Sequence, residues 1–157
     1  VSTSYMPGGA GDETVDPYRV TAQWSRRMIG LKVFMAVAEL GLEGYGKIIE
    51  YQADLGNLLR RRLEQAGWLI RNKTSLPVVC FSHPAIERGS VTTEQLLTTI
   101  YARGRVWISD VALGGKERVL RACVTSFRSD SSDIECLIDE LEHALRTQTR
   151  PGREDLT

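Results

Sequence analysis

The sequence has few cysteines, no excess of charge and no long hydrophobic run, and each absence excludes a class of protein. Its three cysteines lie far apart with no CxxC spacing, so a disulfide framework or zinc ribbon is not indicated. Twenty basic residues balance twenty acidic ones, so the broad positive surface of a nucleic-acid-binding protein is missing. The most apolar stretch, residues 30–42, contains Lys32 and Glu39 and is shorter than the roughly 18 residues of a membrane span.

The cysteines and histidines point to no special chemistry. Cys80 and Cys123 fall in apolar strand patterns and Cys136 in a helical pattern, so we expect buried, reduced thiols in a cytoplasmic protein. His83 and His143 have no acidic or thiol partner at ligand spacing, and we therefore expect no metal site.

With 157 residues, 42% of them hydrophobic and 25% charged, the chain has room for one soluble domain with its own core. It begins with Val1 and a strand-like stretch, with no visible signal peptide. We therefore expect a processed chain or a fragment of a longer protein.

The first third of the chain predicts a loop and two helices. Residues 6–17 are rich in glycine and acidic side chains, which predicts a mobile loop. A helix is expected from about residue 21 to Gly41; it is apolar on both faces and should be buried on most sides. A second helix is expected over residues 43–66, with Gly67 as its left-handed cap. Arginines 60–62 form either a solvated last turn or a phosphate site.

The remainder alternates between strands and helices. Strands are expected over residues 68–70, 76–81, 106–109 and 119–126, the last two joined through a Gly-Gly pair at 114–115. Thr92 with Gln95, and Ser132 with Glu135, have the spacing of capping boxes that begin helices. The sequence thus predicts an α/β protein of α+β type, with a small, mainly antiparallel sheet covered by helices.

Three residues stand out as candidates for chemistry. Arg121 interrupts an apolar strand, where its guanidinium either faces a polar cleft and grips a carboxylate or is an edge or ion-paired arginine. Tyr5, at the base of the glycine-rich loop, is either a proton donor carried by a lid or a packing residue. Ser25 at a helix start either approaches a phosphate or is an ordinary first-turn serine.

A family resemblance bears on these alternatives. The run YRVTAQWSRRMIGLKVFMAVAELGLEGY resembles the pyridoxal-phosphate-dependent group II amino acid decarboxylases, which include the aromatic-L-amino-acid, glutamate and diaminobutyrate enzymes. LPVVCFSHP and VLRACVTSFRSDSSDIECLIDELEHAL resemble the first strand and the closing strand and helix of that family's C-terminal domain. The likeness extends in order to about residue 145.

The resemblance implies the C-terminal portion of a fold-type I homodimer. Residues 1–20 would be the end of the large domain with its catalytic loop, 21–67 connecting helices, 68–148 the small domain and 149–157 a flexible tail. Tyr5 matches the loop tyrosine that reprotonates the substrate carbon across the dimer interface. Ser25 matches the position near the partner's cofactor phosphate, and Arg121 the arginine that meets or lines the substrate pocket. The residues that match supporting positions are Tyr18, Arg19 and Arg26.

The departures from the family are equally specific. The sequence contains no Asn-Pro-His-Lys cofactor lysine, no aspartate for the pyridine nitrogen and no histidine to stack on the ring. Pyridoxal 5'-phosphate would therefore be held mainly by an upstream cofactor-binding portion of the same enzyme. The alternative interpretation is a non-catalytic α+β dimerisation or binding module that uses the apolar helices of residues 30–66 as an interface.

Overall fold

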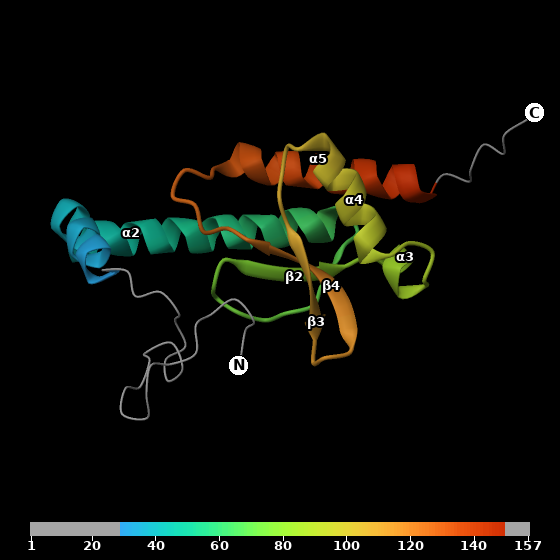
Figure 1. Cartoon of the computed structure of the whole chain (residues 1–157), viewed down its shortest axis with the longest axis horizontal. Helices are drawn as coiled ribbons and strands as arrows, with labels where there is room; N and C mark the ends of the chain where they lie inside the picture. The colour runs from blue at the N-terminus through green and yellow to red at the C-terminus, as the bar shows by residue number, and fades with distance from the viewer. Residues whose placement is uncertain (1–28, 150–157) are drawn as a thin grey trace, which may run out of the picture. The chain divides into compact units, whose positions relative to one another are not determined.

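The computed structural model describes residues 29–149 in four helices and one sheet, and the side chains of residues 30–149 (Figure 1). The chain divides into two compact units, Val1–Tyr45 and Gly46–Thr157. Residues 1–28 and 150–157 are outside the described part. Tyr5, Ser25, Tyr18, Arg19 and Arg26 are therefore not placed by the structure.

The long helix α2 (Ile29–Gln65) is interrupted at Gly41, where the backbone turns to φ 66° and ψ 171°. This is the position at which the sequence predicted one helix to stop and another to begin. The expected burial of the first segment is wrong for this structure, because none of residues 30–45 is buried. Phe34 is 69% exposed and Leu42 is 79% exposed.

The second part of α2 belongs to the unit that contains the sheet. Leu55, Leu59 and Leu63 follow one another at four-residue spacing on one face and are at most 5% exposed. The helix ends at Gly67 in the left-handed conformation with φ 82°, as the sequence predicted. The Trp68 amide donates to the Leu63 carbonyl in this C-terminal turn.

The four strands form one antiparallel sheet in the order β1-β2-β4-β3. Their bounds are β1 Leu69–Ile70, β2 Val78–Ser82, β3 Ser109–Leu113 and β4 Glu117–Cys123. The Gly114-Gly115 turn joins β3 to β4, and both glycines have positive φ. The strand predicted over residues 106–109 is misplaced, because pairing with β4 begins only at Ser109, opposite Arg121.

Three shorter helices complete the fold: α3 (Pro84–Glu87), α4 (Thr93–Arg103) and α5 (Ser131–Thr149). The sequence did not predict α3, which is a single turn capped by His83. The capping box of Thr92 and Gln95 is confirmed at the start of α4.

The second predicted capping box is wrong. The Asp130 carboxylate accepts the Ser132 amide at 2.7 Å, while Glu135 binds Arg62 instead of reaching back to the cap. The Asp130 side chain thus takes the role that the sequence analysis gave to Ser132.

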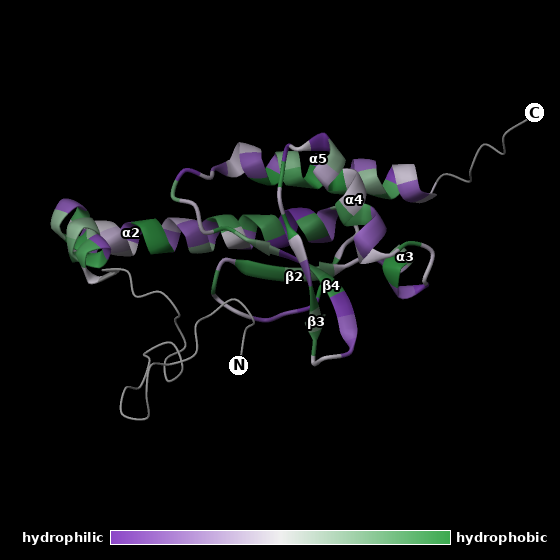
Figure 2. Cartoon of the chain, viewed as in Figure 1, coloured by the Kyte–Doolittle hydropathy of each residue, from purple (hydrophilic) through white to green (hydrophobic). Residues whose placement is uncertain are grey.

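The core lies between the sheet and α2, α4 and α5. In β4, Leu120 and Ala122 belong to the same buried cluster as Leu59, Leu96 and Leu141. Figure 2 shows the strands as largely apolar ribbons and α5 with polar and apolar positions alternating along its length. The helices therefore cover the face of the sheet onto which the even-numbered residues of β4 project.

The contact between α2 and the start of β2 is unusually close. A Cβ built on Gly56 would lie 2.8 Å from the Cα of Pro77. One turn later, Arg60 donates to the carbonyls of Leu76 and Val78 at 2.9 and 3.0 Å. Arg62 in the same basic run binds Glu135 on α5, so these two arginines serve tertiary contacts and are neither a solvated turn nor a phosphate site.

Gly56→Ala should destabilise the protein, because its methyl group would meet backbone that Arg60 holds in place. We expect a loss of about 1–3 kcal/mol in the free energy of unfolding, measured by urea denaturation. Gly46→Ala is the matched control: it is also a helical glycine, but an added Cβ meets nothing within 4 Å. That variant should gain about 0.5–1 kcal/mol. Equal effects of the two substitutions would contradict the close contact.

Candidate functional site

Arg121 lies near the centre of the sheet, on the face opposite the helices. Its β4 neighbours Leu120 and Ala122 point into the core, so the period-two alternation sends Arg121 to the other side. The register places Cys80 of β2 and Ser109 of β3 directly beside it. The sequence predicted a strand-borne arginine, and the structure shows it flanked by two small polar side chains.

The guanidinium of Arg121 is incompletely paired. Its Nε is buried and has no hydrogen-bond partner in the described part of the chain. Burial raises the pKa of the neighbouring Cys80 thiol, while the positive charge of Arg121 opposes that shift. A buried guanidinium N–H without an acceptor is costly, which favours an anion as its missing partner.

The structure does not show whether the candidate residues come together. Among the six candidates, Arg121 is described, whereas Tyr5, Ser25 and the supporting residues lie outside the described range. The expectation of buried thiols holds for Cys80 alone: Cys123 is exposed and Cys136 is half-buried, and all three are free.

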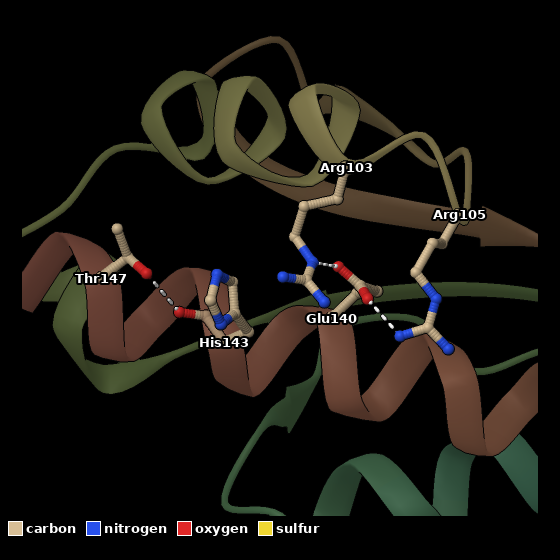
Figure 3. Close-up of polar contacts among 5 residues, drawn as sticks. All are labelled: Arg103, Arg105, Glu140, His143 and Thr147. Atoms are coloured by element: carbon tan, nitrogen blue, oxygen red, sulfur yellow. Dashed lines mark hydrogen bonds and ion pairs between the residues drawn. The ribbon is translucent and has the colours of Figure 1, made fainter.

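A second charged cluster was missed by the sequence analysis. Glu140 on α5 is 1% exposed, and its carboxylate accepts Arg103 Nε at 2.6 Å and Arg105 Nη1 at 2.9 Å. Figure 3 shows the two arginines reaching it from the end of α4 and from the segment that follows. A signal was present, since Glu140 interrupts the apolar stripe of Leu137, Leu141 and Ala144.

This Glu140 clamp fixes the segment that leads into β3. Arg105 is held by Glu140, and the Ile108 carbonyl accepts the Tyr101 hydroxyl. Both contacts keep residues 105–108 against the helices, which explains why β3 begins only at Ser109. The clamp therefore helps to set the strand that flanks Arg121.

A cavity of about 240 Å³ opens at the end of β4. Trp107 and Cys123 lie at its edge, and its floor is formed by core side chains such as Ile134 and Leu137. Arg121 is not among its lining residues, as expected for a side chain on the other face of the sheet.

Two searches of the described residues found nothing further. Within residues 29–149, no group of histidine, cysteine and acidic side chains is arranged to hold a metal ion. In the same range, no helix combines the length and apolarity that a membrane crossing requires.

Comparison with solved structures identifies the fold. The chain is similar to Oryza sativa TDC, solved with PLP and tryptamine, at 16% identity and a TM-score of 0.70 over 88% of this chain. It is similar to mouse CSAD in its apo form at 21% identity and 0.67 over 87%, and to Lactobacillus brevis glutamate decarboxylase at 21% and 0.67 over 78%. No family model and no curated protein matches.

The matched region is a minor part of these proteins. The chain spans 31%, 32% and 28% of the Oryza sativa, mouse and Lactobacillus structures, respectively. The chain therefore has the fold of about one third of a decarboxylase structure, in agreement with the small antiparallel sheet and helices expected of such a domain.

Glu140→Gln should lower the stability of the protein, and the loss should depend on pH. The hydrogen bond from Arg103, opposed by burial, lowers the pKa of Glu140. Its contribution is therefore fully present above the pKa of an unfolded glutamate, about 4.3, and is lost as pH falls through the lower folded-state value. We expect a deficit of about 1–3 kcal/mol at pH 7 that shrinks in more acidic solution, measured by urea unfolding.

Glu142→Gln is the control for this variant, because Glu142 is exposed and pairs with Arg146 only across one helical turn. Its effect should stay within about 0.5 kcal/mol. A deficit for Glu140→Gln that did not change between neutral and acidic pH would contradict the role of the carboxylate charge.

Proposed function

We propose that this chain is the C-terminal part of a pyridoxal-phosphate-dependent L-amino acid decarboxylase. It would supply a loop proton donor, Tyr5, and a pocket arginine, Arg121, to a cofactor held by another part of the same enzyme. Ser25 would lie near the cofactor phosphate across a homodimer, with Tyr18, Arg19 and Arg26 in support. The enzyme would act in the cytoplasm on a small L-amino acid.

The observation that carries the proposal is the combination of the fold with the setting of Arg121. The fold matches part of several amino acid decarboxylases, and Arg121 presents a buried Nε without an acceptor on the sheet face that the helices leave uncovered. A planar guanidinium in this setting suits a carboxylate, the group that every amino acid substrate carries.

The residues of this chain do not by themselves fit the cofactor. Its lysines are Lys32, Lys47, Lys73 and Lys116, and none follows an Asn-Pro-His sequence. In enzymes that bind it, pyridoxal phosphate serves as the electron sink for breaking bonds at the α-carbon. We therefore assign to this chain only the steps that its own groups can perform.

Those steps are recognition and proton delivery. Loss of carbon dioxide leaves the substrate carbon with an electron pair, and a proton must replace the carboxylate to give the amine. The phenol of Tyr5 would donate that proton, and the glycine-rich residues after it would allow the loop to bring it to the site and exclude water.

Tyr5→Phe, tested in the chain combined with its cofactor-bearing part, should slow amine formation by about 10²–10⁴-fold, the range for a lost general acid. Side products formed at the unprotonated carbon should rise relative to the amine. Carbon dioxide release and amine yield, followed together by mass spectrometry, separate the two effects. Tyr51→Phe, at an exposed tyrosine of α2, is the control and should retain full activity. Full turnover with clean amine from Tyr5→Phe would exclude the assignment.

Arg121→Lys should weaken substrate recognition, because lysine keeps the charge but loses the planar fork. The lost charge-assisted hydrogen bond corresponds to about 10–100-fold in kcat/KM. Arg61→Lys is the control, since Arg61 is exposed on α2. Steady-state kinetics with the combined enzyme measures both variants. An unchanged kcat/KM for Arg121→Lys would show that Arg121 is only structural.

A further inference from the structure

Residues 30–45, the first described segment of α2, are apolar on every side and yet exposed. Their sequence, GLKVFMAVAELGLEGY, contains three charged residues in sixteen positions. Exposure of the large apolar side chains ranges from 41% at Leu40 to 79% at Leu42. The members of this apolar segment are Leu31, Val33, Phe34, Met35, Leu40, Leu42 and Tyr45.

Such a helix is unstable in water without a covering surface. A helix on the surface of a protein keeps a polar face, whereas one that is hydrophobic all round belongs in the interior. Each large apolar side chain gains about 1.5–3 kcal/mol when it is fully buried. Contiguous patches of this kind on soluble proteins mark contact sites. The described residues therefore lack the surface against which this segment packs.

We propose that the apolar segment docks against the larger, cofactor-bearing part of the same decarboxylase, and that this contact joins the two parts of the enzyme. This inference rests on the proposed function. The matched Oryza sativa and mouse structures each contain more than twice as much polypeptide as this chain covers. A folded domain of that size can surround a helix on most of its sides.

Two other occupants fit the segment less well. A second copy of the chain would form a two-helix contact, which buries one stripe of each helix and leaves the remaining apolar sides in water. A membrane surface binds helices that carry a basic polar face, and this segment has one basic residue, Lys32.

Hydrogen exchange of residues 30–45, read by mass spectrometry, tests the proposal. We expect rapid exchange in the isolated 157-residue chain and at least tenfold slower exchange once the cofactor-bearing part is added. Phe34→Glu should weaken binding of that part at least tenfold in titration calorimetry, because it buries an unpaired charge. Leu76→Glu, at another exposed leucine but outside the segment, should leave binding unchanged.

The alternatives give distinct results, each of which overturns the proposal. Protection in a dimer of the isolated chain, lost in Phe34→Glu, would identify a second copy as the occupant. Protection in the monomer that disappears when residues 1–28 are deleted would identify the chain's own N-terminal residues. Co-sedimentation with vesicles of phosphatidylcholine and phosphatidylglycerol at 3:1, lost in Phe34→Glu, would identify a membrane surface. Rapid exchange that persists after the cofactor-bearing part is added would show that this part does not cover the segment.

Binding and activity are measured separately, so the two proposals can fail independently. Protection of residues 30–45 without decarboxylation would contradict the proposed function and leave the docking surface standing. Decarboxylation by a complex in which these residues still exchange rapidly would contradict the docking surface alone.

Discussion

The alternation of side chains along β4 is the constraint on which the candidate site depends. The strand must place Val119 and Arg121 on one face and Leu120 and Ala122 on the other, because successive residues project to opposite sides. The helices cover the face of Leu120, which is fully buried. A shift of one residue in the pairing of β4 would bury the guanidinium among core leucines, at a cost that no ion pair in the described region offsets.

Contacts outside the strands hold this register in place. Asn72 binds β2 in the manner of a neighbouring strand, accepting the Cys80 amide at 2.8 Å and donating to the Val78 carbonyl at 3.0 Å. Arg60 reaches the same carbonyl from α2. On the other side of β4, the Glu140 clamp fixes the approach to β3. The strands on either side of Arg121 are thus each tied to a polar side chain beyond the sheet.

The sequence predicted the parts of this arrangement that follow from periodicity and from local capping. The stops at Gly41 and Gly67, the capping box at Thr92 and the Gly-Gly turn before β4 are properties of short segments, and they were found. The start of β3 and the role of Asp130 were missed because both depend on partners distant in sequence. Arg105 is held by a residue 35 positions away, and Glu135 is taken from the predicted cap by an arginine 73 positions away. Such competition leaves no trace in a local pattern. The candidate site was predicted one residue at a time, and Arg121 is the member whose setting the structure describes.

Two features of the described residues remain energetically incomplete, and they need different partners. Arg121 lacks an acceptor for its buried Nε, which an anion would supply, whereas the apolar segment of residues 30–45 lacks a covering surface, which only apolar groups would supply. A membrane or a second copy of the chain would satisfy the helix but provides no specific carboxylate for the arginine. A larger polypeptide with a bound substrate provides both. The two deficits arise in separate units of the chain and from opposite physical causes, so their agreement on one kind of partner supports the decarboxylase proposal more strongly than either does alone.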